Sequence, residues 1–249
     1  MACLICKSVN AQECIQEYLN WDKYEKYIGI DDIYRHWWKC GNCGHYSQSR
    51  NYPLEKLEKI YQHGYRDEAF RGKTIQQQHG GVDGSENLIR VDWFLKHTSP
   101  GTLLDIGSGL GIFPESLTQH KYSVQCQEEN ELSRKFITEQ LGFPCHAELP
   151  NQKFEIVSLV HVLEHIEKPD EFLARLRKMV TCNLFVEVPD AREFAYLPKA
   201  HDEFNSCHLW FFTLQNLITL IERNGFTVVE ASRKFYPQRE LSRILVVAS

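Results

Sequence analysis

The stretch LLDIGSGLG at residues 103–111 constrains the fold more than any other part of the sequence, because an apolar run ends there in three closely spaced glycines. A glycine-rich turn between a strand and a helix lets a ligand approach the backbone, and in open α/β folds it lies at the carboxyl edge of the sheet. From residue 101 onward, apolar runs typical of strands alternate with amphipathic runs typical of helices. This alternation predicts a mostly parallel sheet with helices on both faces.

The last two expected strands are separated by no helical pattern, so the final strand is predicted to return antiparallel to its neighbours. No internal repeat is present. The predicted strands are 101–106, 122–127, 154–160, 183–188, 226–231 and 243–248, and the predicted helices are 85–97, 112–120, 131–141, 169–180 and 214–224.

Nine cysteines, an odd number, favour metal ligation and free thiols over a disulfide framework. Four of them form two CxxC pairs, Cys3 with Cys6 and Cys40 with Cys43. Two such pairs supply the four soft ligands of a closed tetrahedral site, so we predict one structural zinc ion. Two unrelated cysteine pairs are the alternative interpretation.

Composition changes between the second cysteine pair and the glycine-rich turn. The polar segment at 72–85 contains four glycines and is expected to form a loop or a mobile lid. We therefore predict a zinc-ribbon-like module and substrate lid over residues 1–80, followed by the α/β domain over residues 81–249.

Charge and hydropathy exclude several classes of function. The net charge of −5, with basic residues scattered along the chain, argues against a nucleic-acid partner, because binding phosphates requires concentrated Lys and Arg. No apolar run approaches the roughly 20 residues that span a bilayer, and the amino terminus lacks a signal pattern. We expect a cytoplasmic protein without a membrane partner.

Two carboxylates accompany the glycine-rich turn. Asp105 precedes its first glycine by two residues, and Glu128 follows the next predicted strand. A carboxylate at that second strand end can accept hydrogen bonds from both ribose hydroxyls of an adenosine. The run DIGSGLG lacks the GxGxxG spacing of dinucleotide folds, and an acid at Asp105 would repel a pyrophosphate but suits the ammonium group of a methionine.

The run DIGSGLG resembles the first motif of class I S-adenosylmethionine-dependent methyltransferases, and the likeness covers roughly residues 85–249. Residues 154–180 resemble the segment around their fourth strand, and residues 208–226 resemble their carboxyl-terminal part. The resemblance implies a Rossmann-like sheet of seven strands whose last strand is reversed. It also implies cofactor contacts: Asp105, Gly107 and Gly109 at the methionine part, His161 near its end, Glu128 at the ribose and Glu148 at the adenine.

The acceptor site is expected between the fifth strand and the last long helix. His208 in that stretch is our first choice for the general base, because a neutral imidazole has a suitable pKa. Sugar methyltransferases with an amino-terminal zinc-binding segment, which act on nucleotide-linked sugars, resemble this chain and carry a histidine here. An acid often precedes it in them, whereas this chain has Cys207. The resemblance also implies a role for Tyr65 over the active site, and His165 is the remaining candidate.

Packing roles are the alternatives for His208 and Tyr65. The run HVLEH at 161–165 also resembles a metalloprotease signature in reverse order, but Pro169 follows too soon for the long helix such a site needs.

These features predict methyl transfer from S-adenosylmethionine to a small molecule, with a hydroxyl of a nucleotide-linked or surface-glycan sugar as the expected acceptor in polysaccharide biosynthesis. Longer sugar C-methyltransferases carry a further carboxyl-terminal domain, which favours O-methylation here. A methyltransferase-like module that recognises a macromolecule through its zinc ribbon is one alternative, and N- or C-methylation of another metabolite is a second. The acceptor and the oligomeric state are not readable from the sequence.

Overall fold

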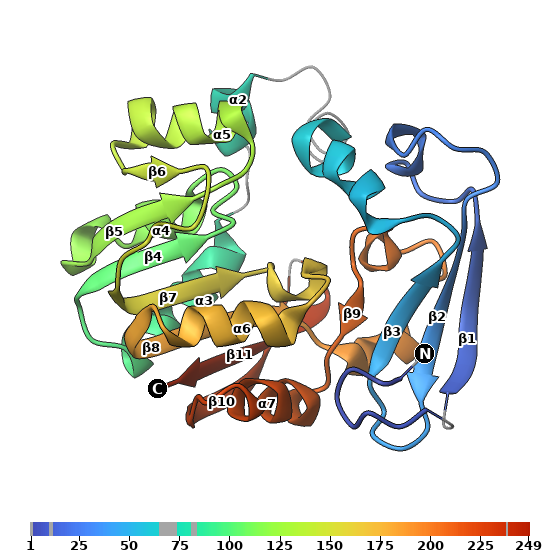
Figure 1. Cartoon of the computed structure of the whole chain (residues 1–249). Coiled ribbons are helices and arrows are strands. Elements are labelled where there is room, and N and C mark those ends of the chain that lie inside the picture. The colour runs from blue at the N-terminus through green and yellow to red at the C-terminus, as the bar shows by residue number, and fades with distance from the viewer. Residues whose placement is uncertain (1, 10–11, 65–73, 81–83, 238) are drawn as a thin grey trace.

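The computed structural model describes residues 2–9, 12–64, 74–80, 84–237 and 239–249. It contains a seven-stranded sheet and a four-stranded sheet that lie beside each other (Figure 1). Among the described residues, no helix is both long and apolar enough to cross a membrane.

The larger sheet has the strand order β10-β11-β8-β7-β4-β5-β6. The pairs from β6 through β8 are parallel, whereas β11 runs antiparallel to both β8 and β10. The predicted fold class, an α/β sheet of seven strands with a reversed last strand, is therefore confirmed. Its strands are β4 (Thr102–Ile106), β5 (Ser123–Gln127), β6 (Cys145–His146), β7 (Phe154–Val160), β8 (Val180–Pro189), β10 (Val228–Tyr236) and β11 (Leu241–Ala248).

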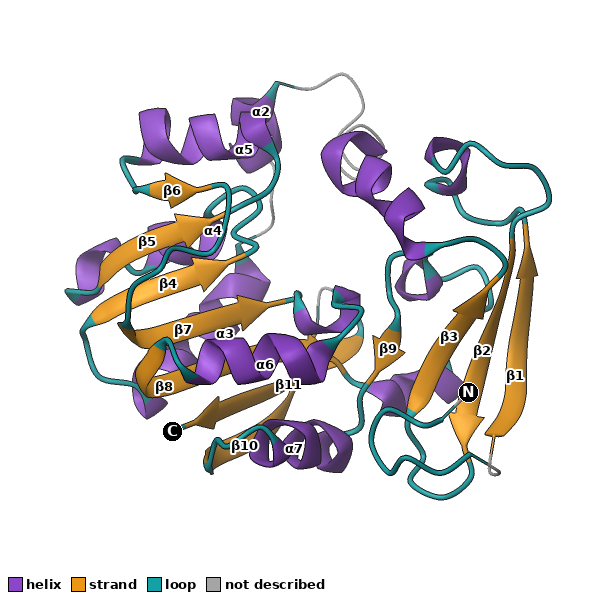
Figure 2. Cartoon of the chain, in the orientation of Figure 1, coloured by secondary structure: helices purple, strands orange, loops and turns teal. Residues whose placement is uncertain are grey.

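Helices cover both faces of this sheet because its central strands are apolar on both sides (Figure 2). Leu104 packs with Leu173 and Leu217 on the face under α6 and α7, whereas its neighbour Leu103 packs with Phe94 on the opposite face. The helices are α3 (Ser85–His97), α4 (Ile112–Ser116), α5 (Glu131–Phe136), α6 (Pro169–Arg177) and α7 (Leu214–Arg223).

Three predicted helices are shorter than expected, and one predicted loop is partly helical. The helix predicted over 169–180 ends at Arg177, and Val180 begins β8. The segment 112–120 changes to a 3-10 turn after α4, and the segment 131–141 changes to a π-helical turn after α5. Part of the expected lid forms α2 (Ile75–Gly80). The remaining short helices are η1 (Glu25–Tyr27), η2 (Leu54–Leu57), η3 (Ile60–Gly64), η4 (Thr118–His120), η5 (Ile137–Leu141), η6 (Leu163–His165), η7 (Ala191–Ala195) and η8 (Asp202–Phe204).

The smaller sheet is antiparallel and has the order β1-β2-β3-β9. Its last strand comes from far along the chain, because Tyr46 of β3 pairs with Phe211 of β9. Trp37 and Tyr46 pack with Phe194 and Phe204 from the segment that follows β8. Residues on both sides of the expected boundary near residue 80 thus build this sheet. Its strands are β1 (Gln12–Leu19), β2 (Tyr34–Cys40), β3 (Tyr46–Arg50) and β9 (Trp210–Phe211).

Candidate active site

The glycine-rich turn leaves the carboxyl end of β4 and enters α4. Gly107 has a φ of +66°, and a Cβ built on it would lie 2.7 Å from a methyl carbon of Val162. Only glycine fits this position without strain, both because of its backbone angle and because of the contact. Gly109 has a φ of +56° but faces open space. The turn therefore presents backbone rather than side chains at the edge of the sheet.

Glu128 lies directly after β5 and closes the turn from the side. Its carboxylate accepts a hydrogen bond of 2.7 Å from the backbone N–H of Gly109 and one of 2.8 Å from that of Asn130. Burial raises the pKa of Glu128, and these two backbone hydrogen bonds act against that rise. The structure thus places the predicted ribose-binding carboxylate next to the glycines, where the sequence predicted it.

Asp105 is buried within the sheet. Its carboxyl oxygen accepts a hydrogen bond of 2.6 Å from the hydroxyl of Ser158, the residue beside it on β7. Burial raises the pKa of Asp105 to about 6, although hydrogen bonds from Ser158 and Ser108 lower it. The carboxyl group lies under the turn and holds two neighbouring strands together.

Gln127 is a residue of this site that sequence reasoning missed. Its side-chain amide donates to the carbonyl of Ala147 at 3.0 Å, and its oxygen lies 3.4 Å from the N–H of Gly107. It therefore links the turn to the segment that contains Glu148, whose own side chain is exposed. The only sequence signal was its position as the last residue of a strand, just before Glu128.

His161 follows β7 and bridges two buried carboxylates. Its Nδ1 lies 3.2 Å from Glu164 Oε1, and its Nε2 lies 3.2 Å from Glu187 Oε1. Burial opposes the charged imidazolium, but the two carboxylates raise the pKa of His161. Both ring nitrogens can then donate, so the ring is held in one orientation.

Glu187 belongs to a buried ion pair that the sequence did not reveal. Arg90 of α3 donates from Nε and Nη2 to its two carboxylate oxygens, each at 2.7 Å, and Tyr236 donates a third hydrogen bond at 3.1 Å. Burial acts to raise the pKa of Glu187, but Arg90 lowers it well below its usual range. This pair fixes α3 to β8 and, through His161, supports the end of β7.

The structure brings His165 and His208 together, with ring centres 4.8 Å apart. His165 Nδ1 lies 3.0 Å from the carbonyl oxygen of Cys207, and His208 Nδ1 lies 2.7 Å from that of Glu203. A carbonyl only accepts, so each Nδ1 carries a proton, and in the neutral form of each ring the lone pair is on Nε2. Burial lowers the pKa of His165 to about 4, which keeps this ring neutral at physiological pH.

Cys207 precedes His208 directly, but a carboxylate from another position lies beside the His208 ring. Cys207 is fully buried, whereas a Glu203 carboxylate oxygen lies 3.6 Å from His208 Nδ1. Burial acts to raise the pKa of Glu203, but Arg243 and His208 lower it to about 2. The 3-10 turn η8 places this carboxylate beside the ring. Tyr65, the third predicted catalytic residue, lies outside the described residues.

The four cysteines of the two CxxC pairs converge. The Sγ atoms of Cys3 and Cys43 are 3.5 Å apart and those of Cys6 and Cys40 are 3.6 Å apart, and all four sulfurs lie within 4.8 Å of one another. Four thiolates at about 2.3 Å from one zinc ion stand about 3.8 Å apart, so the donor set fits that metal. A hydrogen bond from Asn42 lowers the pKa of Cys6 to about 6, which favours the thiolate.

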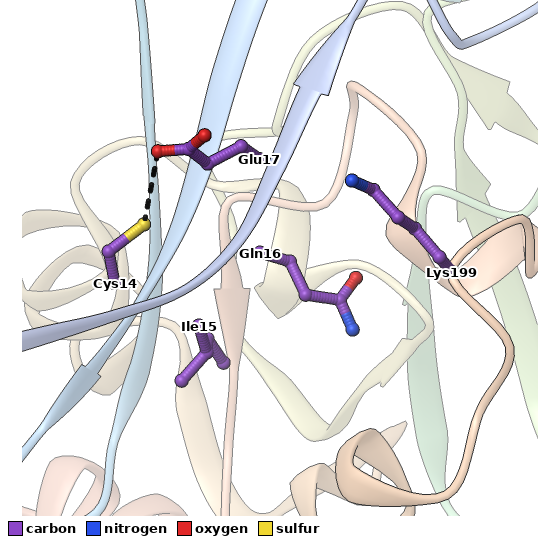
Figure 3. Close-up of a pocket in the computed structure, with 5 residues that line it drawn as sticks. All are labelled: Cys14, Ile15, Gln16, Glu17 and Lys199. Carbon is purple, nitrogen blue, oxygen red and sulfur yellow. Dashed lines mark hydrogen bonds between the residues drawn. The ribbon is translucent and has the colours of Figure 1, made fainter.

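A separate surface hollow lies on β1 and the segment after η7 (Figure 3). Cys14, Gln16 and Glu17 line it together with Ile15 and Lys199, and the Cys14 sulfur lies 3.9 Å from a Glu17 oxygen. None of the predicted site residues that the structure describes lines it, so it is distinct from the arrangement at the end of the large sheet.

Comparisons with known proteins agree with this geometry. The sequence matches a family described as a methyltransferase domain over residues 87–231. No match was found among curated proteins. The chain is similar to the structure of magnesium protoporphyrin IX methyltransferase from Synechocystis PCC 6803 with bound S-adenosylhomocysteine, at 14% identity and a TM-score of 0.58, covering 78% of this chain and 98% of that one.

Two further similar structures have equally low identities. One is the 1,6-didemethyltoxoflavin-N1-methyltransferase of Burkholderia thailandensis, at 15% identity and a TM-score of 0.53, covering 83% of this chain and 96% of that one. The other is a glycopeptide N-methyltransferase, at 14% identity and a TM-score of 0.53, covering 68% and 91%. At these identities the likeness shows the fold, and the family match adds the activity. The chain belongs to the methyltransferase-domain family and is an enzyme with the class I fold that uses S-adenosylmethionine.

Proposed function

We propose that this enzyme methylates a hydroxyl of a small molecule, with a sugar as the acceptor. The observation that carries the proposal is the pair of imidazoles of His165 and His208 beside the buried Glu164. They lie beyond the end of β7, the strand next to the one that enters the glycine-rich turn. A hydroxyl acceptor must lose a proton to react, whereas an amine only has to be unprotonated. Two imidazoles at this place, each held by a hydrogen bond from Nδ1 to a backbone carbonyl, therefore favour O-methylation over N-methylation.

On the cofactor side, we propose that Gly107 and Gly109 let the methionine part approach the backbone and that Asp105 serves its ammonium group. Glu128 binds the ribose hydroxyls in this proposal, supported by its position against the backbone N–H of Gly109. The two remaining proposed contacts are His161 at the methionine end and Glu148 near the adenine.

The reaction is an in-line displacement at the methyl carbon. The acceptor oxygen forms a bond to the methyl group while the bond from that carbon to sulfur breaks, so the sulfonium becomes the thioether of S-adenosylhomocysteine. The hydroxyl proton passes to His208 Nε2, which has its lone pair available because Nδ1 donates to the Glu203 carbonyl. Glu203 stabilises the resulting imidazolium, as its carboxylate lies 3.6 Å from Nδ1.

The four converging cysteines support a structural zinc ion in residues 1–80, with residues 81–249 as the catalytic domain. The module packs on that domain: Asn216 of α7 donates to the Cys43 carbonyl at 3.1 Å, and Arg223 donates to the Ile5 carbonyl at 2.7 Å. The zinc in this proposal orders a wall of the acceptor site and takes no part in methyl transfer. The resemblance to sugar methyltransferases with such a segment supports a nucleotide-linked or surface-glycan sugar.

Calorimetric titration with S-adenosylmethionine and S-adenosylhomocysteine tests the cofactor side. Glu128→Ala removes a carboxylate that accepts two hydrogen bonds, and we expect at least about tenfold weaker binding. Glu129→Ala is the matched control, because Glu129 directly follows Glu128 and its side chain is exposed. Equal affinities for the two variants would contradict the role of Glu128.

Methyl transfer to nucleotide-linked sugars, simple phenols and amino sugars, followed by mass spectrometry, tests the acceptor side. We expect an O-methylated sugar and a loss of about 10²–10⁴-fold in turnover for His208→Ala. Methylation of an amine alone would exclude the O-methylation proposal. A protein that binds neither cofactor form would instead support the alternative of a binding module.

A further inference from the structure

One carboxylate oxygen of Glu164 lacks a hydrogen-bond partner among the described residues. Oε1 lies 3.2 Å from His161 Nδ1, but Oε2 is buried and has no hydrogen-bond partner among the residues that the structure describes. The side chain is fully buried. Leaving a buried charged oxygen unpartnered costs at least about 1–3 kcal/mol, so a native protein usually supplies a partner.

The surroundings of this oxygen contain the donor set of a metal site. One candidate ligand atom from each of Glu164, His165 and His208 lies within 4.8 Å of the other two. Both histidines donate Nδ1–H to a backbone carbonyl, at 3.0 Å for His165 and 2.7 Å for His208. Metal-binding histidines almost always have this arrangement, because the outer hydrogen bond fixes the ring and leaves Nε2 as the ligand atom.

We propose that Glu164, His165 and His208 bind one divalent transition-metal ion at which the acceptor hydroxyl is activated. Two imidazoles and one carboxylate suit Mn²⁺, Fe²⁺, Co²⁺ or Zn²⁺ better than Mg²⁺ or Ca²⁺. Bonds of about 2.1 Å would bring the three ligand atoms to about 3–4 Å from one another. The most widely separated ligand atoms, at up to 4.8 Å, therefore need to close by about 1–2 Å.

This inference rests on the proposed function for its acceptor. In the metal-bound site His208 Nε2 binds the ion, so the role of His208 as the base applies only to the metal-free site. The ion would lower the pKa of the acceptor hydroxyl, which then loses its proton to water before the oxygen attacks the methyl carbon. The site is chemically different from the cysteine cluster, which offers only thiolates. A hard ion such as Mn²⁺ prefers nitrogen and oxygen ligands and therefore distinguishes the two sites.

The test is a titration of the intact, zinc-loaded protein with Mn²⁺, followed by electron paramagnetic resonance and calorimetry. We expect one Mn²⁺ per chain, and nitrogen couplings in the pulsed spectrum that report directly bound imidazoles. Glu164→Gln and His208→Gln should each weaken binding by at least about tenfold. Glu167→Gln is the matched control, because its side chain is exposed three residues after Glu164.

The outcomes separate this inference from the proposed function, because S-adenosylmethionine binding is measured on the same samples. Cofactor binding without Mn²⁺ binding overturns the metal site and leaves the methyltransferase proposal standing. Mn²⁺ binding that is unchanged in both variants, or that shows no nitrogen couplings, also overturns the metal site. The couplings are read in the unmodified protein, so the test remains decisive if either variant fails to fold.

Discussion

Replacing Arg90 by methionine should destabilise the whole enzyme, although this residue is far in sequence from the site it supports. The substitution leaves the fully buried Glu187 without the two charge-assisted hydrogen bonds of 2.7 Å that it receives from α3. Removing one partner of a buried ion pair costs about 3–5 kcal/mol, because the other charge remains in a medium of low dielectric constant. Tyr236 and His161 still donate to Glu187, so the expected loss is at the lower end, about 3 kcal/mol.

Urea denaturation followed by circular dichroism and by tryptophan fluorescence measures this loss. A change of about 3 kcal/mol, divided by an m-value of about 3 kcal/mol/M for a large domain, lowers the urea midpoint by about 1 M. Lys96→Met is the control on the same helix, because it breaks an ion pair with Asp92 whose side chains are 63% and 67% exposed. Exposed pairs contribute about 0–1 kcal/mol.

A third variant separates charge from packing. In the double variant Arg90→Met/Glu187→Leu, no buried carboxylate is left without its partner, so part of the lost stability should return. The recovery is incomplete because Tyr236 and His161 lose an acceptor. If Arg90→Met cost no more than Lys96→Met, the buried pair would not hold α3 to β8, and the argument would be refuted.

Three further predictions concern single features of the structure. Metal analysis should find about one zinc ion per chain in the purified protein, and none bound at the cysteine cluster of Cys40→Ser/Cys43→Ser; zinc retained by that variant would contradict a four-cysteine site. The pKa of Asp105 is raised by burial to about 6, so the stability that its protonated form provides is complete below about pH 4 and is lost as the pH rises to about 6. Asp105→Asn should remove this part of the pH dependence of the free energy of unfolding, and an unchanged pH profile would show that the carboxyl group does not titrate in this range. Gly107→Ala should weaken S-adenosylmethionine binding and destabilise the fold by more than Gly109→Ala does. Both glycines have a positive φ, but only a Cβ at Gly107 meets a neighbouring side chain, at 2.7 Å. Equal effects of the two substitutions on the thermal midpoint would show that this contact is relieved without cost.

Most of the large sheet was predictable because its inner strands are buried on both faces and so read as continuous apolar runs. The edge strand β10 is only partly buried, and β6 consists only of Cys145 and His146 and is too short to give a pattern. The positions of Glu128 and of the glycines followed from the same reasoning, since a strand end and the next turn are close in sequence as well as in space.

The polar network was not predictable because its members are distant in sequence. Arg90 and Glu187 are 97 residues apart, and a charged residue in a helix pattern is normally assigned to the solvent face. The carboxylate beside His208 was missed for a different reason. The family resemblance concerns the position directly before the histidine, whereas in this chain a 3-10 turn brings Glu203 from five positions before it.

The pairing of β3 with β9 has a consequence for the newly synthesised chain. Residues 34–50 leave the ribosome long before residues 210–211 are made, so β3 has an open edge until that later segment is synthesised. An unpaired strand edge is a site where other chains can add, and a contact across so many residues forms late. The segment that closes this edge also carries His208, two residues before Trp210. Completion of the amino-terminal sheet and placement of His208, the proposed base, are therefore one event, which follows the synthesis of β1, β2 and β3 by more than 150 residues.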